Sequence, residues 1–335
     1  MNQRMKIVKE IGALKKQDQT PIYRPEREKE IIDRLIASNE GALDRRAVEA
    51  IFLEIFAVSR KFEMPERVSY LGPFGSFSHQ AAELQFGAMN EYLPLSSIRS
   101  VFETVDTERS KYGVIPIENN QEGVVSETVY LLEEFEVQIV AEMPLDIHFA
   151  FGTREESLSR IDKIYTRDIA FKQCRKFIRE HFPENQVQLI PVESTSKAVK
   201  IAMEEGSSAA ICSHVAAKEF NLPILFDNIE DSSSNQTRFL IISKNSANQP
   251  SEADKTSIMA KLPHRPGGLA AFLVEFHRAG INLTKIESYP AKRGKNFRYW
   301  FFIEFEGHRL NQNVSEILTR HGEDLKWLGS YARLC

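Results

Sequence analysis

The chain has 335 residues, 42% of them hydrophobic and 27% charged, which is typical of two or three folded domains and excludes a disordered chain. The net charge of −4 gives no basic field that would attract nucleic acid, and no apolar run is long enough to span a bilayer. We therefore expect the protein to bind neither nucleic acid nor a membrane. Cys174, Cys212 and Cys335 are widely spaced, which argues against structural zinc and a disulfide framework. With no secretory signal visible, a cytoplasmic location is expected.

Apolar side chains at helical spacing predict three helices at the N-terminus. The first covers residues 4–16. The second begins with Pro25 in its first turn and runs to about Asn39, with Gly41 as a plausible C-terminal cap. Asp44 can cap a third helix, whose apolar stripe covers residues 48–62. Helices this short cannot bury their stripes alone, so a partner chain or a further upstream helix is expected to cover them.

Beyond residue 66, strands alternate with helices, as in an α/β domain. Short apolar runs bounded by turn residues predict strands at residues 68–71, 112–117, 137–141, 164–166, 187–191, 209–212 and 240–242. Helical patterns lie at residues 79–86, 126–134, 171–180, 195–205 and 213–220. Ligands of such sheets bind where strands end and helices begin.

A polar linker at residues 245–254 precedes a compact C-terminal unit. Its predicted elements are strand, helix, two strands, helix and strand, at residues 256–262, 268–280, 282–288, 297–305, 311–321 and 326–331. This order is that of a ferredoxin-like fold. We therefore expect a helical domain at residues 1–65, an α/β domain at 67–244 and a ferredoxin-like domain at 255–335.

Polar residues at two strand ends are candidates for a binding site. In the loop of residues 72–78, the Ser76 and Ser78 hydroxyls and nearby backbone N–H groups could hold an anion at a helix N-terminus. A structural turn with a serine cap explains them equally well. Glu118 and Asn119 end a buried strand. They could line a cleft, but they fit an ordinary turn from strand to loop equally well.

Hydroxyl groups mark two further positions. Thr195 lies in a run of three hydroxyl residues that opens a helix, where a simple helix cap is favoured over an anion site. Thr237 and Arg238 precede an apolar strand, where an arginine beside a hydroxyl could fix a carboxylate and present a proton donor. A surface arginine at a loop-to-strand junction is the alternative.

Charged residues also gather in the N-terminal helices. Arg4 and Lys15 are separated by about three helical turns and so share a face of the first helix. Arg27, Glu28 and Glu63 are polar positions on the adjoining helices. Converging cations suit a small dicarboxylate, although a solvated basic face is favoured on these residues alone.

Together these segments resemble one family along nearly the whole chain, the bifunctional chorismate mutase–prephenate dehydratases of phenylalanine biosynthesis. Residues 70–82 (YLGPFGSFSHQAA) resemble the dehydratase motif GPxGTFSxxAA, residues 116–123 (PIENNQEG) resemble PIENSxEG, and residues 235–239 (NQTRF) match NxTRF. Residues 282–290 (NLTKIESYP) and 266–269 (PGGL) resemble the NLTKIESRP and PGAL segments of the regulatory ACT domain.

The resemblance implies a dehydratase of two α/β lobes, like a periplasmic binding protein, with its active site in the cleft between them. The reaction removes water and CO2 from prephenate to give phenylpyruvate, without metal or organic cofactor. Thr237 would assist loss of the ring hydroxyl, and Arg238 would contact or orient a carboxylate. The remaining cleft positions are Ser76, Ser78, Glu118, Asn119, Thr195 and Phe239.

The N-terminal helices resemble an all-helical chorismate mutase, which rearranges chorismate by positioning and charge stabilisation. The resemblance places the substrate against Arg4, Lys15, Arg27, Glu28 and Glu63. Lys15 and Glu63 would face the ether oxygen. Glu63 stands where many relatives have glutamine, and a carboxyl must be protonated to donate that hydrogen bond, so mutase activity should fall as the pH rises.

L-Phenylalanine is the expected allosteric effector, and the resemblance places it at Gly267, Gly268, Leu269, Asn282, Leu283, Glu287 and Ser288. The sequence departs from the family at several positions. Tyr289 replaces an arginine, Gly268 an alanine and Asn120 a serine, and residues 166–169 (TRDI) stand where SHPQ is common, although Gln173 and Cys174 are retained. The first helix is expected to be shortened, without the arginine that a mutase dimer takes from its partner.

Two alternative functions stay open. The helices could be an inactive dimerisation arm of a monofunctional dehydratase, and a non-enzymatic two-lobed small-molecule-binding protein would share the same fold. The expected assembly is a homodimer or homotetramer, because the helical stripes need covering and ACT-type sheets commonly pair through edges or helices.

Overall fold

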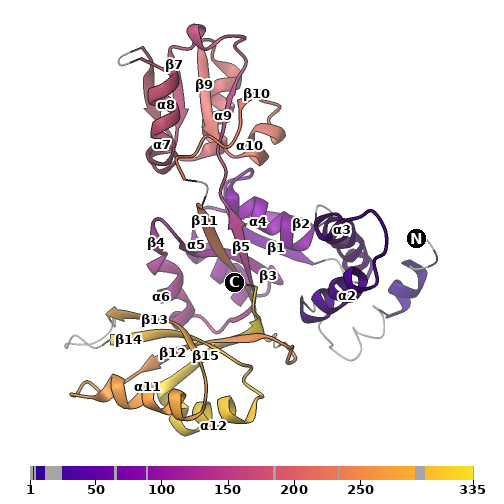
Figure 1. The fold of residues 1–335 in the computed structure, drawn as a ribbon, viewed down its shortest axis with the longest axis vertical. Helices are drawn as coiled ribbons and strands as arrows, with labels where there is room; N and C mark the ends of the chain where they lie inside the picture. The colour runs from indigo at the N-terminus through magenta and orange to yellow at the C-terminus, as the bar shows by residue number, and fades with distance from the viewer. Residues whose placement is uncertain are drawn as a thin grey trace.

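The computed structural model describes residues 3, 5–11, 25–63, 66–87, 90–183, 186–232, 234–246, 248–290 and 299–334. An α/β lobe at the centre, lobe 1, carries a helical arm on one side, a second α/β lobe at one end and a sheet domain at the other (Figure 1). The expected fold class is confirmed in each of its three parts. Within the described residues, no helix has the length and apolar character needed to cross a membrane.

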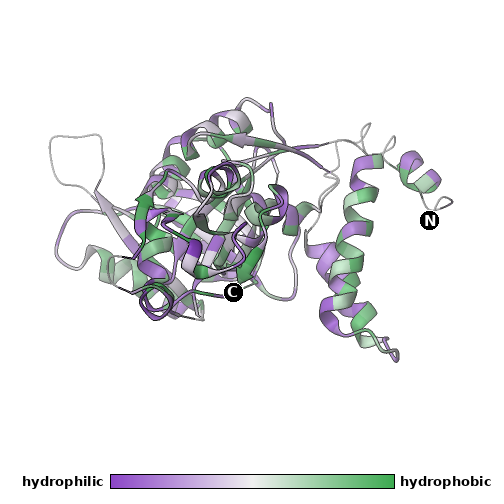
Figure 2. Ribbon diagram, turned by 90° about the horizontal axis from the view of Figure 1, so that it is seen from above, coloured by the Kyte–Doolittle hydropathy of each residue, from purple (hydrophilic) through white to green (hydrophobic). Residues whose placement is uncertain are grey.

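The helical arm consists of a helical stretch at residues 5–11, α2 (Pro25–Ala37) and α3 (Arg45–Glu63). It projects to one side of the molecule, and hydrophobic and hydrophilic bands alternate along it (Figure 2). Val48 and Phe56 are buried, whereas Ile51 and Phe62 on the same helix are 47% and 42% exposed. The chain therefore covers only part of the apolar stripe on α3.

The ends of the arm helices test two of the predicted caps. The Asp44 carboxylate accepts the backbone N–H of Ala47 at 2.8 Å, which confirms Asp44 as the cap of α3. The cap predicted at Gly41 is wrong, because α2 already ends at Ala37. The Ser38 hydroxyl donates to a carbonyl of the last turn at 3.0 Å and so supplies the backbone with an alternative to another helical turn.

Lobe 1 is built on a six-stranded sheet of order β2-β1-β3-β11-β5, with β4 paired to β3. The strands are β1 (Arg67–Leu71), β2 (Glu91–Leu95), β3 (Tyr112–Asn119), β4 (Gly123–Val124), β5 (Gln138–Asp146) and β11 (Gln236–Ser243). The helices are α4 (Phe77–Phe86), α5 (Ile98–Asp106) and α6 (Ser126–Glu134). β1, β2 and β3 are parallel, and β11 runs antiparallel between β3 and β5. β11 is therefore an inner strand, buried on both faces at Leu240 and Ile241.

Lobe 2 is built on a five-stranded sheet of order β10-β6-β9-β7-β8. Its strands are β6 (Ala150–Thr153), β7 (Lys163–Thr166), β8 (Gln188–Pro191), β9 (Ser208–Cys212) and β10 (Ile224–Phe226). Its helices are η1 (Leu158–Arg160), α7 (Asp168–Gln173), α8 (Arg175–His181), α9 (Thr195–Glu204) and α10 (His214–Glu219).

One predicted helix of lobe 2, at residues 171–180, is broken at Cys174 into α7 and α8. Asp231 causes the break from a distant part of the chain. Its carboxylate accepts the backbone N–H of Lys176 at 2.9 Å at the start of α8, and its own N–H donates to the carbonyl of Gln173 at 2.6 Å. These bonds replace the intrahelical bonds of a continuous helix.

The chain passes between the two lobes twice, after β5 and before β11, and the two crossing segments are bonded to each other. The backbone N–H of Ile147 donates to the carbonyl of Asn235 at 2.8 Å, and that of Phe149 donates to the carboxylate of Glu230 at 2.9 Å. We call these segments, residues 147–149, 229–232 and 234–235, the hinge.

The C-terminal domain has a four-stranded sheet of order β13-β14-β12-β15, which confirms the ferredoxin-like order. Its elements are β12 (Asp254–Lys261), α11 (Gly268–Arg278), β13 (Leu283–Pro290), β14 (Tyr299–Glu306), α12 (Gln312–His321), η2 (Gly322–Asp324) and β15 (Leu325–Ala332). Both α-helices cover one face of the sheet (Figure 1). The other face packs on lobe 1, where Met259, Phe302 and Leu328 share a core with Ile139.

Candidate functional site

A chain of side-chain amides crosses from lobe 2 to lobe 1 through the hinge. The Gln173 carbonyl at the end of α7 accepts from the Asn235 amide at 2.9 Å. The Asn119 amide at the end of β3 donates to Asn235 Oδ1 and to the Thr237 hydroxyl oxygen, each at 2.9 Å. These four residues, which we call the amide chain, bring Asn119 and Thr237 together as direct partners across two antiparallel strands.

The amide chain fixes which way the Thr237 hydroxyl points. Asn119 Oδ1 accepts the backbone N–H groups of Gln121 at 2.9 Å and Glu122 at 3.1 Å, so the NH2 end of its amide faces Thr237. Because the Thr237 oxygen accepts that N–H, its own hydrogen points elsewhere. A hydroxyl that accepts a hydrogen bond is also a stronger donor. Thr237, which is partly buried, therefore has a hydroxyl hydrogen that can be donated beside the hinge.

Arg238 lies on the opposite face of β11 from Thr237, because successive side chains of a strand alternate. Its guanidinium donates to Glu118 at 2.8 Å, Glu142 at 2.9 Å and Glu304 of the C-terminal domain at 2.9 Å. Arg238 is only 6% exposed, and three protein carboxylates occupy its donors. The structure thus does not bring Arg238 or Glu118 to the face that presents Thr237, and it gives no support to substrate contact by either.

The charges around Arg238 shift the acidity of its partners. Burial acts to raise the pKa of Glu118, but Arg238 and Lys285 outweigh it and hold that pKa below its ordinary value. Burial acts in the same way on Glu142, where Lys255 and Arg238 lower the pKa. Both carboxylates are therefore ionised at neutral pH and balance the buried cations.

The remaining predicted residues of the α/β domain fall into two groups. Phe239 is 2% exposed and packs in the lobe core, so a cleft ligand cannot contact it. Ser76 caps α4 by accepting the backbone N–H of His79 at 3.2 Å, and its hydroxyl donates to the carbonyl of Leu71 at 3.1 Å. Ser78 and Thr195 are buried in the first turns of α4 and α9. For Ser76 the geometry fits the structural turn.

The loop before α4 is held from the other lobe. The Ser196 hydroxyl donates to the carbonyl of Phe74 at 2.6 Å, and the Ser213 hydroxyl donates to that of Gly75 at 2.8 Å. Gly75 has a φ of +80°, and a side-chain carbon there would come within 3.0 Å of the Ser196 hydroxyl and 3.1 Å of Ala216 Cα. The two lobes thus meet directly at this loop.

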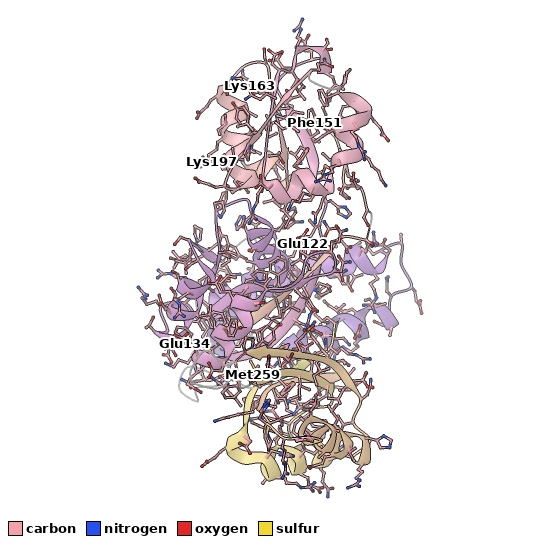
Figure 3. All side chains as sticks on the ribbon, turned by 90° about the vertical axis from the view of Figure 1, so that its left-hand side faces the viewer. Glu122, Glu134, Phe151, Lys163, Lys197 and Met259 are labelled. Atoms are coloured by element: carbon pink, nitrogen blue, oxygen red, sulfur yellow. The ribbon has the colours of Figure 1, made fainter. Side chains whose placement is uncertain are left out.

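A cavity of about 530 Å³ lies between the lobes, with Glu122 on one side and residues of α7, β8 and α9 on the other. Figure 3 labels Glu122 on the central lobe and Lys197 on the upper one, at the level where the lobes meet. The cavity adjoins the amide chain, since Glu122 binds Asn119 and Lys172 precedes Gln173.

The cavity is lined by three basic residues, Arg167, Lys172 and Lys197, and by three acidic ones, Glu122, Asp168 and Glu193. In the parts of the chain that are described, neither Arg167 nor Lys172 has a salt-bridge partner, whereas Lys197 pairs with Glu193 at 3.1 Å. Sequence reasoning did not select Arg167, Lys172 or Gln173 as site residues. Their signal was a predicted strand end followed by a helix, where ligands of α/β sheets bind. Among the described residues, no three His, Cys, Asp or Glu side chains form a group that could hold a metal ion.

The predicted residues of the helical arm can be placed only in part. Arg4 and Lys15 lie outside the described residues, as does the side chain of Glu63. Arg27 is exposed on α2. Glu28 forms an ion pair with Arg60 of α3, and Arg60 also donates to the carbonyl of Phe86 on α4 at 3.0 Å. Glu28 is thereby linked, through Arg60, to lobe 1.

The predicted effector residues lie at both ends of the C-terminal sheet. Gly267 adopts a φ of +77° before α11, and Gly268 and Leu269 begin that helix, beyond the end of β12. Glu287 and Ser288 lie toward this end of the sheet. Their neighbour Tyr289 pairs with Trp300 of β14, and Trp300 pairs in turn with Lys261, the last residue of β12. Asn282 and Leu283 lie at the other end of the sheet. There Leu283 pairs with Phe305 of β14, and Phe305 pairs in turn with Thr256 near the start of β12. A single chain does not bring all seven together.

Tyr289, at the family's arginine position, is 7% exposed and faces lobe 1. Its ring lies 5.6 Å from that of Tyr130 on α6, centroid to centroid and nearly perpendicular. Such an edge-to-face pair stabilises the contact between the sheet and lobe 1. An interdomain packing role therefore accounts for this departure.

Three family models match consecutive parts of the chain: chorismate mutase type II at residues 1–64, prephenate dehydratase at 68–247 and the ACT domain at 256–323. The chain is 40% identical over 340 residues to the bifunctional chorismate mutase/prephenate dehydratase of Aquifex aeolicus, covering 99% of this chain and 93% of that protein. The solved Arthrobacter aurescens prephenate dehydratase in complex with L-Phe is similar at 32% identity and a TM-score of 0.72, covering 80% of this chain and 90% of that one. GqqA, described as a novel type of quorum quenching acylase, is similar at 26% identity and a TM-score of 0.71, covering 80% and 98%.

Proposed function

We propose that this chain, which belongs to the bifunctional chorismate mutase/prephenate dehydratase family, converts prephenate into phenylpyruvate and also rearranges chorismate into prephenate. Control by L-phenylalanine through the ACT domain is part of the proposal, as are a cytoplasmic location and a homodimeric or homotetrameric assembly. The hydrogen bond from Asn119 to Thr237 carries the dehydratase assignment, because the Thr237 oxygen accepts it and the hydroxyl hydrogen is left to be donated to a substrate.

The dehydratase step needs one proton donor and an oriented dicarboxylate. The Thr237 hydroxyl donates its proton to the ring hydroxyl of prephenate as the C–O bond breaks and water leaves. The C–C bond to the ring carboxylate breaks at the same time, its electron pair enters the ring and CO2 departs, so that the ring becomes aromatic. The Asn119 N–H stabilises the Thr237 oxygen until solvent returns its proton.

Orientation of the substrate falls to the cations of the cavity between the lobes. Arg167 and Lys172 line it, and a guanidinium can bind a carboxylate through two parallel hydrogen bonds. These two residues take the role that the resemblance gave to Arg238, whose donors are filled by glutamates. A similar fold by itself does not select the chemistry, as the acylase relative illustrates. The order of three matched domains supports the proposal more directly.

Parallel assays of the full chain test this function. Prephenate and chorismate are supplied separately, with and without L-phenylalanine, and phenylpyruvate is followed. Phenylpyruvate from both substrates supports the bifunctional proposal. Product from prephenate alone would leave a dehydratase with an inactive helical arm. A folded chain that forms no product from either would turn attention to the binding-protein alternative.

Replacing Gly75 with alanine is expected to lower dehydratase kcat/KM about tenfold, mainly through KM. A residue with a side chain costs roughly 1–2 kcal/mol in the left-handed region. The added carbon would also contact Ser196 and Ala216, which separates the lobes. Steady-state kinetics on prephenate measure the effect.

Gly280→Ala is the matched control for that variant. Gly280 lies in the ACT domain and also has a positive φ, of +67°. A side-chain carbon added there would meet no atom within 4 Å. It should keep its KM for prephenate. An equal loss in both variants would show that backbone strain, and not the contact between the lobes, is responsible.

Mutase activity is expected to fall as the pH rises through the pKa of Glu63. The carboxyl donates to the ether oxygen only when protonated, and an ordinary glutamate has a pKa of about 4.3. Above its pKa the protonated fraction, and with it kcat/KM, falls about tenfold per pH unit. Glu63→Gln donates at every pH and should give a flat profile. Matching profiles for both proteins would contradict the role of Glu63.

A further inference from the structure

A buried cluster of charges joins lobe 1 to the ACT domain. Lobe 1 supplies Glu118, Glu142 and Arg238, and the ACT sheet supplies Lys255, Lys285 and Glu304. The Arg238 guanidinium binds both oxygens of Glu304 at 2.9 Å, in the parallel two-bond geometry, and also contacts Glu118 and Glu142. Lys255 binds Glu142 at 2.8 Å, and Lys285 pairs with Glu118. We call these six residues the interdomain ion cluster.

The six residues of the interdomain ion cluster carry no net charge, and Lys285 also lies 3.8 Å from the carboxylate of Glu287 outside the cluster. Three cations face three carboxylates, and Arg238, Glu142, Lys255 and Glu304 are each less than 9% exposed. In such a site the removal of one charge leaves an uncompensated buried charge, which forces its neighbours to move. Glu304 is further fixed by the Ser257 hydroxyl at 3.2 Å. The cluster therefore holds one defined arrangement of strands rather than a loose surface contact.

The cluster lies back to back with Asn119 and Thr237, which we call the catalytic pair, on the same two strands. Glu118 immediately precedes Asn119 on β3, and Arg238 immediately follows Thr237 on β11. In the register of these strands Asn119 is opposite Thr237, and Glu118 is opposite Arg238. One face of this short segment makes the bond that aims the Thr237 hydroxyl. The other face is held by the ACT domain, so a shift of the ACT strands acts on the catalytic geometry across one residue.

Space for such a shift exists beside the cluster. A cavity of about 820 Å³ separates β3 and β11 from the ACT strands, and cluster residues and Asn119 line it. On this side the ACT sheet is therefore not closely packed against lobe 1. It is closely packed where Gly329 contacts Ile139. A movement of the ACT sheet about that tight contact would change its hold on Arg238.

We propose that the interdomain ion cluster is a positioning device through which the ACT domain sets the Asn119–Thr237 geometry, and that phenylalanine controls the dehydratase through it. Arg238 is then a positioning residue, because it acts on the reaction through Thr237 and touches no substrate. This inference rests on the proposed dehydratase function and adds the route by which its site is regulated.

The variant Glu304→Gln tests the device, because it keeps the size of the side chain and removes one charge from the cluster. We expect dehydratase kcat to fall about tenfold with KM within twofold, and the phenylalanine concentration for half-inhibition to rise at least tenfold, within the usual range of coupling between sites. Mutase kcat should stay unchanged. Glu306→Gln is the control, since Glu306 lies on the same strand but pairs with Arg333 at the surface.

A purely structural role of the cluster predicts a different result. Glu304→Gln would then have a lower melting temperature. At a temperature where the chain is folded, both kcat values and the phenylalanine inhibition curve would be unchanged, and that result would overturn the proposal. Arg238→Lys keeps the charge but cannot form the two-bond contact. It should lose phenylalanine sensitivity like Glu304→Gln, and an unaltered response would also count against the device.

The failure of the proposed function is recognised separately. A folded wild-type chain without dehydratase activity would remove the function itself. A wild-type dehydratase that phenylalanine leaves unchanged would keep the function and overturn the regulatory device.

Discussion

Replacing Thr237 with alanine is expected to lower dehydratase kcat by about 10³-fold, within the range of 10²–10⁴ that a positioned proton donor contributes. The substitution removes the hydroxyl that Asn119 aims and leaves Arg238 and its ion pairs intact. The strand should therefore keep its place. Single-turnover kinetics on prephenate, with product followed directly, would measure the chemical step.

Two comparisons make that result specific. Thr237→Ser keeps the hydroxyl and should retain most of the activity, with a loss of no more than about tenfold from its freer side-chain rotation. Mutase kcat in the Thr237→Ala protein serves as an internal control for folding. A Thr237→Ala protein with nearly normal dehydratase kcat would show that another group donates the proton.

Replacing Asn119 with aspartate is expected to be nearly as damaging, with a loss of about 10²–10³-fold at neutral pH. The new carboxylate has the same shape but can only accept hydrogen bonds. The Thr237 hydroxyl would then turn its hydrogen toward residue 119 and away from the substrate. Its oxygen would also lose the N–H that stabilises it during the reaction.

The pH dependence of the Asn119→Asp protein distinguishes this explanation from general damage. Protonation returns a donor to position 119, so activity should rise as the pH falls toward about 4, the ordinary pKa of aspartate. Asn120→Asp is the control, because Asn120 accepts the backbone N–H of Gln236 at 3.0 Å and donates to the carbonyl of Ser234, so it also loses an amide donor but one that is not bonded to Thr237. A pH-independent loss in Asn119→Asp would rule out reorientation of the hydroxyl.

The sequence predicted Asn119 and Thr237, the two residues of the proposed catalytic pair, as site residues but not their contact. Asn119 and Thr237 were each selected beside a strand, from the residues there and from motifs. Their hydrogen bond joins residues 118 positions apart and depends on the register of β3 with β11, which local patterns do not determine. Arg238 was assigned to the same site as Thr237 because it is adjacent in sequence. Alternation along a strand places it on the other face, and only the tertiary structure shows which face the cleft occupies.

Elements without a clear local pattern were also missed. β2 lies at an edge of the lobe 1 sheet and contains Pro94, which fits an edge strand but weakens the sequence signal. The break between α7 and α8 depends on Asp231, more than 50 residues away, so the local pattern predicted one continuous helix. The helices α6 and α9 were placed within one residue of their ends, whereas α5 was not predicted, although Val101, Phe102 and Val105 lie at helical spacing.

The double crossing at the hinge also determines when each lobe can be completed during synthesis. All of lobe 2 lies between β5 and β11 in the sequence, yet β11 is the strand that joins β3 to β5. On the ribosome, lobe 2 has every strand of its own sheet before lobe 1 does. The growing chain therefore carries β3 and β5 with unpaired edges, which invite pairing with other chains, until β11 emerges. Closure of the sheet by β11 is a long-range step of the kind that slows folding, and it creates the catalytic pair at the same moment.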